Sequence, residues 1–145
     1  MDKAIEILIV EDNASDAELA MRTLKKSNLS NKILWLKDGE EAMDYLKGEG
    51  SYKGRNTKSK PKVIFLDLKM PKMDGHEVVK EIRTTQSIKE IPIVMMTSSQ
   101  EQKDRLAAYN NGVNSYIVKP MDFGDFSQAI SDIGYYWLAL NKPPN

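Results

Sequence analysis

The sequence contains no cysteine and carries no excess of charge of either sign. Without cysteine the chain has no disulfide framework, no thiolate metal site and no thiol nucleophile, which is typical of a cytosolic protein. The 21 basic and 21 acidic side chains give a formal net charge of +0, so no overall field attracts nucleic acid or an anionic membrane. We therefore expect neither nucleic acid nor a membrane among the binding partners.

Long apolar runs are also missing. No segment is apolar for long enough to span a bilayer. The first apolar run is cut short by Glu11 and Asp12, and it lacks the longer core and the small-residue cleavage site of a signal peptide. At 145 residues the chain has the size of one ordinary domain. These features predict a single cytoplasmic domain over residues 1–145.

Short apolar runs alternate with segments of helical periodicity. Five runs have strand length and are rich in β-branched or aromatic residues, namely 5–10, 33–36, 63–66, 93–96 and 116–118. Apolar residues recur at helical spacing between them, and capping-box sequences at 15–18 and 99–102 predict helix starts. This alternation predicts an α/β fold in which helices cover both faces of a parallel sheet.

Polar side chains stand where four of the predicted strands end. They are Glu11 and Asp12 after the first, Asp67 after the third, Thr97 and Ser98 after the fourth, and Lys119 after the fifth. In doubly wound sheets, ligands bind outside the carboxyl ends of the strands. Four strand ends that present acid, acid, hydroxyl and amine therefore indicate one shared site.

The residue types at these strand ends suit phosphoryl chemistry with a metal ion. Carboxylates that converge on one crevice repel one another, so they either raise their pKa values or hold a cation. Mg²⁺ prefers oxygen ligands and usually takes one or two carboxylates with phosphate oxygens, which fits Asp12 and Asp67 with Glu11 in support. An aspartate can also form an aspartyl phosphate, and Asp67 is the candidate nucleophile. Lys119, Thr97 and the metal would stabilise the charge of the transferred group.

At these positions the sequence resembles the CheY-like receiver domains of bacterial two-component response regulators. The matching segments follow the order and spacing of that family, at 10–12, 66–75, 96–98 and 116–120. The resemblance implies a flavodoxin-like fold, with five helices around a five-stranded parallel sheet of order 2-1-3-4-5. It also implies a signalling protein rather than an enzyme, one that assists its own phosphorylation and dephosphorylation.

The resemblance assigns a role to each of the acidic residues. It implies that Asp67 accepts a phosphoryl group from the phosphohistidine of a sensor histidine kinase. It further implies that Mg²⁺ is bound by Asp12, Asp67 and the backbone carbonyl of Lys69, with Glu11 reaching the ion through water.

The remaining family positions concern the phosphoryl group and the switch. The resemblance implies that Lys119, the Thr97 hydroxyl and the Ser98 amide contact the phosphoryl oxygens. Thr97 then moves inward, and Tyr116 swings into the space behind it and changes the surface of the domain. The bond between Lys119 and Pro120 resembles the cis peptide of the family, which makes Pro120 a cis-peptide candidate.

Two segments extend the minimal family pattern. Residues 48–61 hold four basic side chains and one acid, a local charge of +3, and we expect a solvated, mobile loop there, with a partner contact as the second alternative. The C-terminal extension 138–145 follows an aromatic-rich stretch that either marks an interface or folds onto its own helix. Together the two segments resemble the receiver subgroup that partners bacterial phytochrome kinases. Some members of that subgroup dimerise, so we expect a phytochrome kinase and a homodimer among the partners.

Rival functions need other residues at the same strand ends. Phosphatases that use an aspartate nucleophile typically have a second acid two residues later, where this sequence has Lys69. A flavin carrier would need a phosphate-cradling loop at 11–13. A receiver fold that acts only as a constitutive docking module remains an alternative, although all the acidic, hydroxyl and amine positions are filled. We expect the output to be a downstream protein or a phosphotransfer domain. The only histidine, His76, is predicted to be a surface side chain.

Overall fold

The computed structural model describes residues 4–29 and 32–144 of the chain. Five parallel strands form one sheet in the order β2-β1-β3-β4-β5: β1 (Ile7–Val10), β2 (Ile33–Leu36), β3 (Val63–Leu66), β4 (Ile93–Thr97) and β5 (Ser115–Val118). Five α-helices alternate with them: α1 (Ala14–Lys26), α2 (Gly39–Lys47), α3 (Gly75–Thr84), α4 (Gln102–Asn111) and α5 (Phe123–Tyr135). The predicted flavodoxin-like fold and strand order are confirmed. None of the helices within these ranges is long and apolar enough to cross a membrane.

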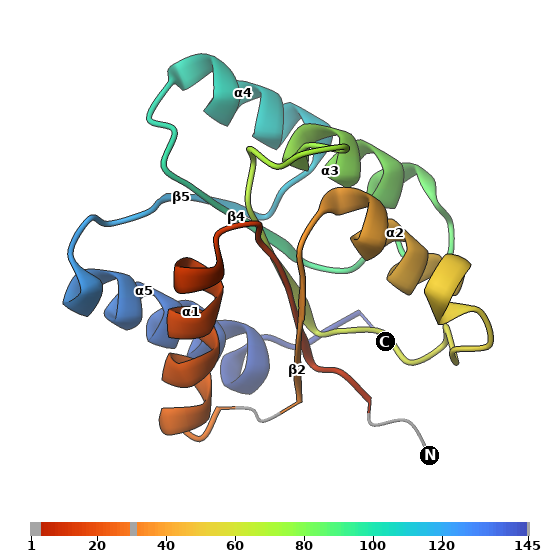
Figure 1. Ribbon diagram of the computed structural model, residues 1–145, viewed down its shortest axis with the longest axis horizontal. Helices are drawn as coiled ribbons and strands as arrows, with labels where there is room; N and C mark the ends of the chain where they lie inside the picture. The colour runs from red at the N-terminus through yellow and green to blue at the C-terminus, as the bar shows by residue number, and fades with distance from the viewer. Residues whose placement is uncertain (1–3, 30–31, 145) are drawn as a thin grey trace.

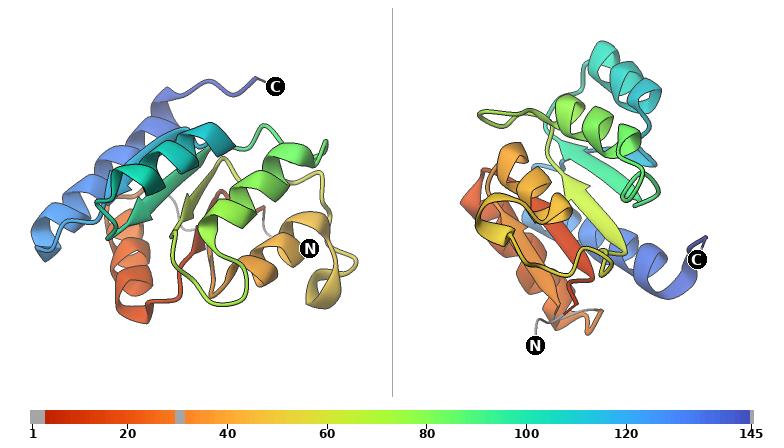
Figure 2. Two further views of the ribbon diagram at one scale, coloured as in Figure 1. Left: turned by 90° about the horizontal axis from the view of Figure 1, so that it is seen from above. Right: turned by 90° about the vertical axis from the view of Figure 1, so that its right-hand side faces the viewer.

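The helices form two layers, one on each face of the sheet. α1 and α5 cover one face and α2, α3 and α4 the other, as Figure 1 shows and as the turned views of Figure 2 confirm. Successive side chains of a strand point to opposite faces, so Leu8 and Val10 join the core under α2 to α4, while Ile7 and Ile9 join the core under α1 and α5. β1, β3 and β4 are buried along their whole length, which explains their continuous apolar sequences.

The start of α1 differs from the prediction. The side chain of Asn13 caps the helix by accepting a hydrogen bond of 3.0 Å from the backbone N–H of Asp16. The capping box predicted at 15–18 is wrong, because Asn13 lies at the end of the β1 loop and satisfies this N–H group before Ser15 is reached.

The capping box of this fold is found at α3. Asp74 accepts from the backbone N–H of Glu77, and the Glu77 carboxylate accepts from the N–H of Asp74. The box predicted at 99–102 is wrong, since Glu101 precedes α4 without a side-chain cap and Ser99 donates its hydroxyl to Asp104. The Ser99 hydroxyl thus binds the side chain of Asp104 in α4.

The basic loop 48–61 is organised around a single arginine. The guanidinium of Arg55 donates hydrogen bonds to four backbone carbonyls, those of Tyr45, Leu46, Asn56 and Ser59, and lies 4.0 Å from the centre of the Tyr45 ring. A short 3-10 helix, η1 (Gly50–Tyr52), fills the first part of the loop. Two of the carbonyls belong to the last turn of α2, so Arg55 acts as a cap for that helix. The loop is therefore not a structureless stretch.

The chain continues from α5 into a π-helical turn, η2 (Tyr136–Leu140). Trp137 and Leu138 both pack against the core on the α1 and α5 face, whereas the side chain of Leu140 is 54% exposed. The π-helical turn is wider than an α-helical one, and it directs Leu138 as well as Trp137 toward this core. This part of the extension folds onto its own domain.

Candidate functional site

Three carboxylates lie together at the carboxyl edge of the sheet. Glu11 and Asp12 directly follow β1, and Asp67 directly follows the neighbouring strand β3. The backbone N–H of Asp67 donates to the carbonyl of Val10 (3.0 Å), which fixes the two strand ends side by side. One oxygen of each carboxylate lies within 4.8 Å of those of the other two. The structure thus brings together the three acids that the strand ends singled out.

Burial differs among the three acids. Glu11 is 6% exposed and Asp67 is 8% exposed, whereas Asp12 faces solvent. Burial and, after it, the neighbouring Asp67 raise the pKa of Glu11 to about 8, against a smaller lowering by Lys119. Two buried carboxylates in one site favour a bound cation, and a set of donors made only of oxygen suits a hard divalent ion.

Lys119 is the cation that the chain itself supplies to this cluster. Its Nζ lies 2.6 Å from Glu11 Oε1, 2.9 Å from Asp16 Oδ2 and 3.7 Å from Asp67 Oδ2. Burial lowers the pKa of Lys119, but the hydrogen bonds to Glu11 and Asp16 outweigh it and the pKa rises to about 12. The lysine is therefore charged at every physiological pH.

Sequence reasoning missed Asp16. The residue was assigned to a helix cap, yet its side chain reaches back from the first turn of α1 to Lys119. The signal that could have found it is its register, because an acid in the first turn after a strand-end loop lies beside that loop.

Thr97 is the last residue of β4, and Ser98 begins the loop that follows it. The Thr97 side chain is buried, and its Oγ1 accepts a hydrogen bond of 3.2 Å from the backbone N–H of Ser99, while Ser98 is exposed. The backbone N–H of Lys119 donates to the Thr97 carbonyl (2.8 Å), which joins the ends of β4 and β5. The hydroxyl proton of Thr97 is thus left available for a further acceptor.

The loop after Asp67 folds tightly back on it at Gly75. A Cβ atom at Gly75 would lie 2.6 Å from the carbonyl oxygen of Asp67 and 2.8 Å from the Cα of Leu68. The N–H of Gly75 donates to the Leu68 carbonyl (2.7 Å). Only glycine allows this approach, which places the exposed Lys69 in the short loop beside the carboxylates.

Two hydrogen bonds and one longer polar contact lead from β5 to α3. The Tyr116 hydroxyl donates to the Ser99 carbonyl (3.0 Å), and the Ser99 hydroxyl donates to Asp104 (2.6 Å). His76 Nε2 lies 3.7 Å from the other Asp104 oxygen, and its Nδ1 is buried without a hydrogen-bond partner. The prediction that His76 is a plain surface side chain is wrong, because α3 turns it toward α4.

The expected cis peptide is absent from the described part of the chain, so the bond between Lys119 and Pro120 is trans. The cis-peptide prediction for Pro120 is wrong for this structure. An X–Pro bond prefers trans by about 0.5–1 kcal/mol, and the cis form requires a surrounding structure that outweighs this preference.

A comparison with protein families matches residues 7–131 to the response regulator receiver domain. This chain belongs to the receiver family of response regulators. The family prediction made from the strand-end residues is confirmed, and the receiver is a signalling domain of two-component systems rather than a conventional enzyme.

Individual relatives agree with this membership. The probable methanogenesis regulatory protein FilR2 of Methanothrix harundinacea is 42% identical over 139 residues, which cover 95% of this chain and 86% of that protein. The crystal structure of the phosphorylated cyanobacterial phytochrome response regulator RcpA is 34% identical, has a TM-score of 0.90 and covers 99% of this chain and 100% of its own. The Mn²⁺-bound form of response regulator Rcp1, a protein of Synechocystis, is 35% identical with a TM-score of 0.89, covering 97% and 99%. The likeness to phytochrome response regulators is also confirmed.

Proposed function

We propose that Asp67 carries a phosphoryl group that a sensor histidine kinase donates, and that Mg²⁺ assists this transfer. The observation that supports the proposal is the position of Asp67, a buried carboxylate that shares its site with two other acids and lies 3.7 Å from the ammonium of Lys119. One Asp67 oxygen accepts from the Leu68 N–H (2.8 Å), and the other faces Lys119.

In the proposed step, an Asp67 oxygen forms a bond to phosphorus while the bond from phosphorus to the histidine nitrogen of the kinase breaks. The electron pair stays on the imidazole, which takes up a proton. Lys119 neutralises charge on the phosphoryl oxygens, the Thr97 hydroxyl donates to one of them, and the exposed Ser98 amide donates to another. Hydrolysis by water returns Asp67 to the free carboxylate, a reaction that the same groups assist.

The acids fit a divalent cation. Asp12, Asp67 and the backbone carbonyl of Lys69 would hold Mg²⁺, with Glu11 linked to it through water. When bound, the ion would supply positive charge to the phosphoryl oxygens. The oxygen-only donor set of the cluster supports this assignment, as does the relative Rcp1, whose structure is that of a Mn²⁺-bound form.

The readout that we propose is a switch through Thr97 and Tyr116. Phosphoryl oxygens attract the Thr97 hydroxyl and so disturb its bond with the Ser99 N–H, while the Tyr116 hydroxyl holds the carbonyl of the same residue. Because both residues bind the backbone of Ser99, a movement of one changes the position of the other. The changed surface would then bind a downstream protein or a phosphotransfer domain.

The kinase partner is proposed from the relatives. RcpA is named as a phytochrome response regulator, and FilR2 is named for the regulation of methanogenesis. A phytochrome-class kinase in the cytoplasm is therefore one candidate donor, and residues 1–145 would serve it as one receiver unit. A homodimer remains part of the proposal for the phosphorylated form.

Acetyl phosphate with Mg²⁺, followed by intact-mass measurement, tests the proposal. Wild type should gain one phosphoryl group, and Asp67→Asn should gain none. Beryllofluoride with Mg²⁺ should protect wild type against thermal unfolding and leave Asp67→Asn unchanged. Equal labelling of the two proteins would overturn the proposal, as would labelling that persists unchanged in EDTA. Light scattering with and without beryllofluoride would separate a dimerising switch from a monomeric one.

A further inference from the structure

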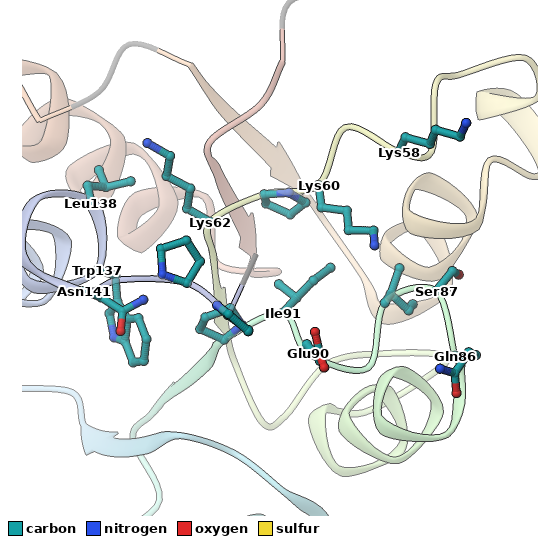
Figure 3. Close-up of a pocket in the computed structure, with 15 residues that line it drawn as sticks. Lys58, Lys60, Lys62, Gln86, Ser87, Glu90, Ile91, Trp137, Leu138 and Asn141 are labelled. Atoms are coloured by element: carbon teal, nitrogen blue, oxygen red, sulfur yellow. The ribbon is translucent and has the colours of Figure 1, made fainter.

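A groove of about 400 Å³ lies at the end of the sheet opposite to the acid site. Its walls come from the segment before β3, the segment before β4 and the turn that follows α5, as Figure 3 shows. The strands are parallel, so the segments that precede β3 and β4 lie at the amino edge of the sheet, whereas Asp67 lies at the carboxyl edge. The groove is thus separate from the site described above.

The floor and ends of the groove are apolar. Ile88 and Ile91 are 2% and 4% exposed and close the floor, and the half-buried Trp137 and Leu138 form one end. Four prolines also line the groove: Pro61, Pro92, Pro143 and Pro144. Because proline fixes its own backbone, the walls are preformed and lose little entropy when they are covered.

One side of the groove is strongly basic. In Figure 3, Lys58, Lys60 and Lys62 lie along the upper side of the view, and Glu90 is the one acid among the described residues that line the groove. Lys62 is paired with Glu6 at 3.0 Å. The exposed ammonium groups of Lys58 and Lys60, by contrast, form no ion pair with any residue that the structure describes. Although the protein has no net charge, these lysines create a local positive potential beside the apolar floor of the groove.

We propose that this groove binds an acidic peptide segment of a partner protein. An apolar or aromatic side chain of the segment lies on the floor beside Trp137, and its Glu or Asp side chains face Lys58 and Lys60. The concave shape keeps a flat membrane surface from reaching the floor, and the apolar floor offers nothing to a nucleic acid backbone. An acidic segment with an apolar anchor satisfies both the charge and the floor.

The position of the groove makes this contact independent of Asp67. The proposed switch acts at the carboxyl edge, where Thr97 ends β4 and the Tyr116 hydroxyl reaches the Ser99 carbonyl, while the groove is built at the amino edge. A partner held there stays bound whether or not the receiver is phosphorylated. Peptide binding in the groove can therefore be tested separately from phosphorylation of Asp67.

The two tryptophans allow a direct test with the ¹⁵N-labelled protein of residues 1–145. Trp137 lines the groove, and the indole N–H of Trp35 donates to the Glu11 carbonyl at the acid end (2.7 Å). The probe is a short synthetic peptide in which Glu and Asp flank a Leu-Phe pair, with a charge-inverted Lys peptide as the comparison. The acidic peptide should shift the indole signal of Trp137 and leave that of Trp35 in place, and binding should weaken as salt is added.

Surface variants locate the contact. Lys58→Glu with Lys60→Glu should weaken binding of the acidic peptide about tenfold, since two favourable charge contacts become repulsive. Lys53→Glu is the matched control, because Lys53 is exposed on the same loop but does not line the groove, and it should bind like wild type. All three positions are exposed, so the variants should fold like the parent.

Several outcomes would overturn the inference. They are equal binding of the acidic and the Lys peptides, no shift of the Trp137 signal, or an equal loss of affinity in the Lys53→Glu control. A Trp137 signal that shifts with protein concentration alone would show that a second copy of this chain covers the groove instead. Binding that beryllofluoride abolishes would contradict the independence of the two ends.

Discussion

Lys119 contacts three carboxylates, those of Glu11, Asp16 and Asp67. Asp16 is the one of these that does not belong to the three-acid cluster of Glu11, Asp12 and Asp67. Asp16 holds the lysine at 2.9 Å, whereas Asp67 lies 3.7 Å from it. A residue of α1 thus competes with the proposed phosphoacceptor for the same positive charge.

The competition predicts the effect of Asp16→Asn. Without this carboxylate, Lys119 should move toward Asp67, and labelling by acetyl phosphate should be about threefold faster, the size expected for one partly exposed ion pair. The rate is measured by intact mass against time. Glu18→Gln, an exposed position on the same helix, is the control and should leave the rate unchanged. A slower rate in Asp16→Asn would contradict the competition.

The bond from Ser99 to Asp104 predicts a pH effect. The Ser99 hydroxyl lowers the pKa of Asp104 below its ordinary 3.8, and His76 adds a smaller lowering. Because the folded pKa is the depressed one, the stabilisation is fully present above the unfolded pKa and is lost as pH falls through the folded pKa. Ser99→Ala should therefore raise the Asp104 pKa in a carboxyl NMR titration.

In urea unfolding, the difference between Ser99→Ala and wild type should be largest near neutral pH and shrink as the pH drops below about 4. Ser98→Ala, at the exposed neighbour, should titrate like wild type at Asp104. A stability difference that persists undiminished in acid would show that Ser99 acts by packing alone.

Some residues of the site could be predicted from the sequence, and others could not. Asp67 and Lys119 could be predicted because each directly follows a strand, and parallel strand ends must meet at one edge. Asp16 could have been found from its register in the first turn of α1, whereas the contact of His76 with Asp104 could not, because it depends on how α3 and α4 turn about their axes and on side-chain rotamers. The pattern of apolar residues does not specify those angles.

Among the elements, the basic loop and α2 form one unit through Arg55. Its guanidinium binds four backbone carbonyls and lies over the Tyr45 ring, so it ties the loop to the last turn of α2, an end that the left-handed Gly48 also caps. Sequence reasoning recognised the length and the charge of the loop. It could not distinguish an arginine directed inward from lysines directed outward, because their charges are the same.

Arg55→Ala should therefore lower the free energy of unfolding by about 2–3 kcal/mol, the size expected for charge-assisted hydrogen bonds lost together. Urea unfolding followed by circular dichroism measures it. Lys53→Ala, an exposed position on the same loop, should change it by less than about 0.5 kcal/mol. Equal effects of the two substitutions would refute the assignment of Arg55 as the loop anchor.

Two apolar side chains are uncovered shortly after Lys119, one in the loop between β5 and α5 and one at the first position of α5. Met121 is 102% exposed and Phe123 is 75% exposed. Exposed apolar groups beside a reactive site indicate a protein contact, and here we expect the kinase to be that partner.

Phe123→Ser should slow phosphoryl transfer from the cognate kinase about tenfold through lost apolar contact and leave labelling by acetyl phosphate unchanged. Radiolabel transfer from the phosphorylated kinase measures the first rate. Leu140→Ser is the control, since Leu140 is also exposed but lies in the turn after α5. A parallel loss in both assays would point to damage at the acid site instead.

Over the whole molecule, the two edges of the sheet at which its strands begin and end carry opposite charge. Three acids, two of them buried, lie at the carboxyl edge, and lysines beside an apolar floor lie at the amino edge. Alternation of strands and helices was enough to predict the layers and the acid end, because the direction of parallel strands places all their carboxyl ends together. The groove was beyond that reasoning, since it requires the C-terminal turn to fold beside the segments before β3 and β4.

The threefold hold on Lys119 also bears on how a signal ends. Lys119 already provides positive charge in this site, so in the proposed reaction the phosphoryl oxygens would replace carboxylate oxygens around a cation that is in place. After the proposed hydrolysis, Glu11 and Asp16 would bind Lys119 again. The protein would thus return to its starting arrangement without unfolding and without the help of another protein.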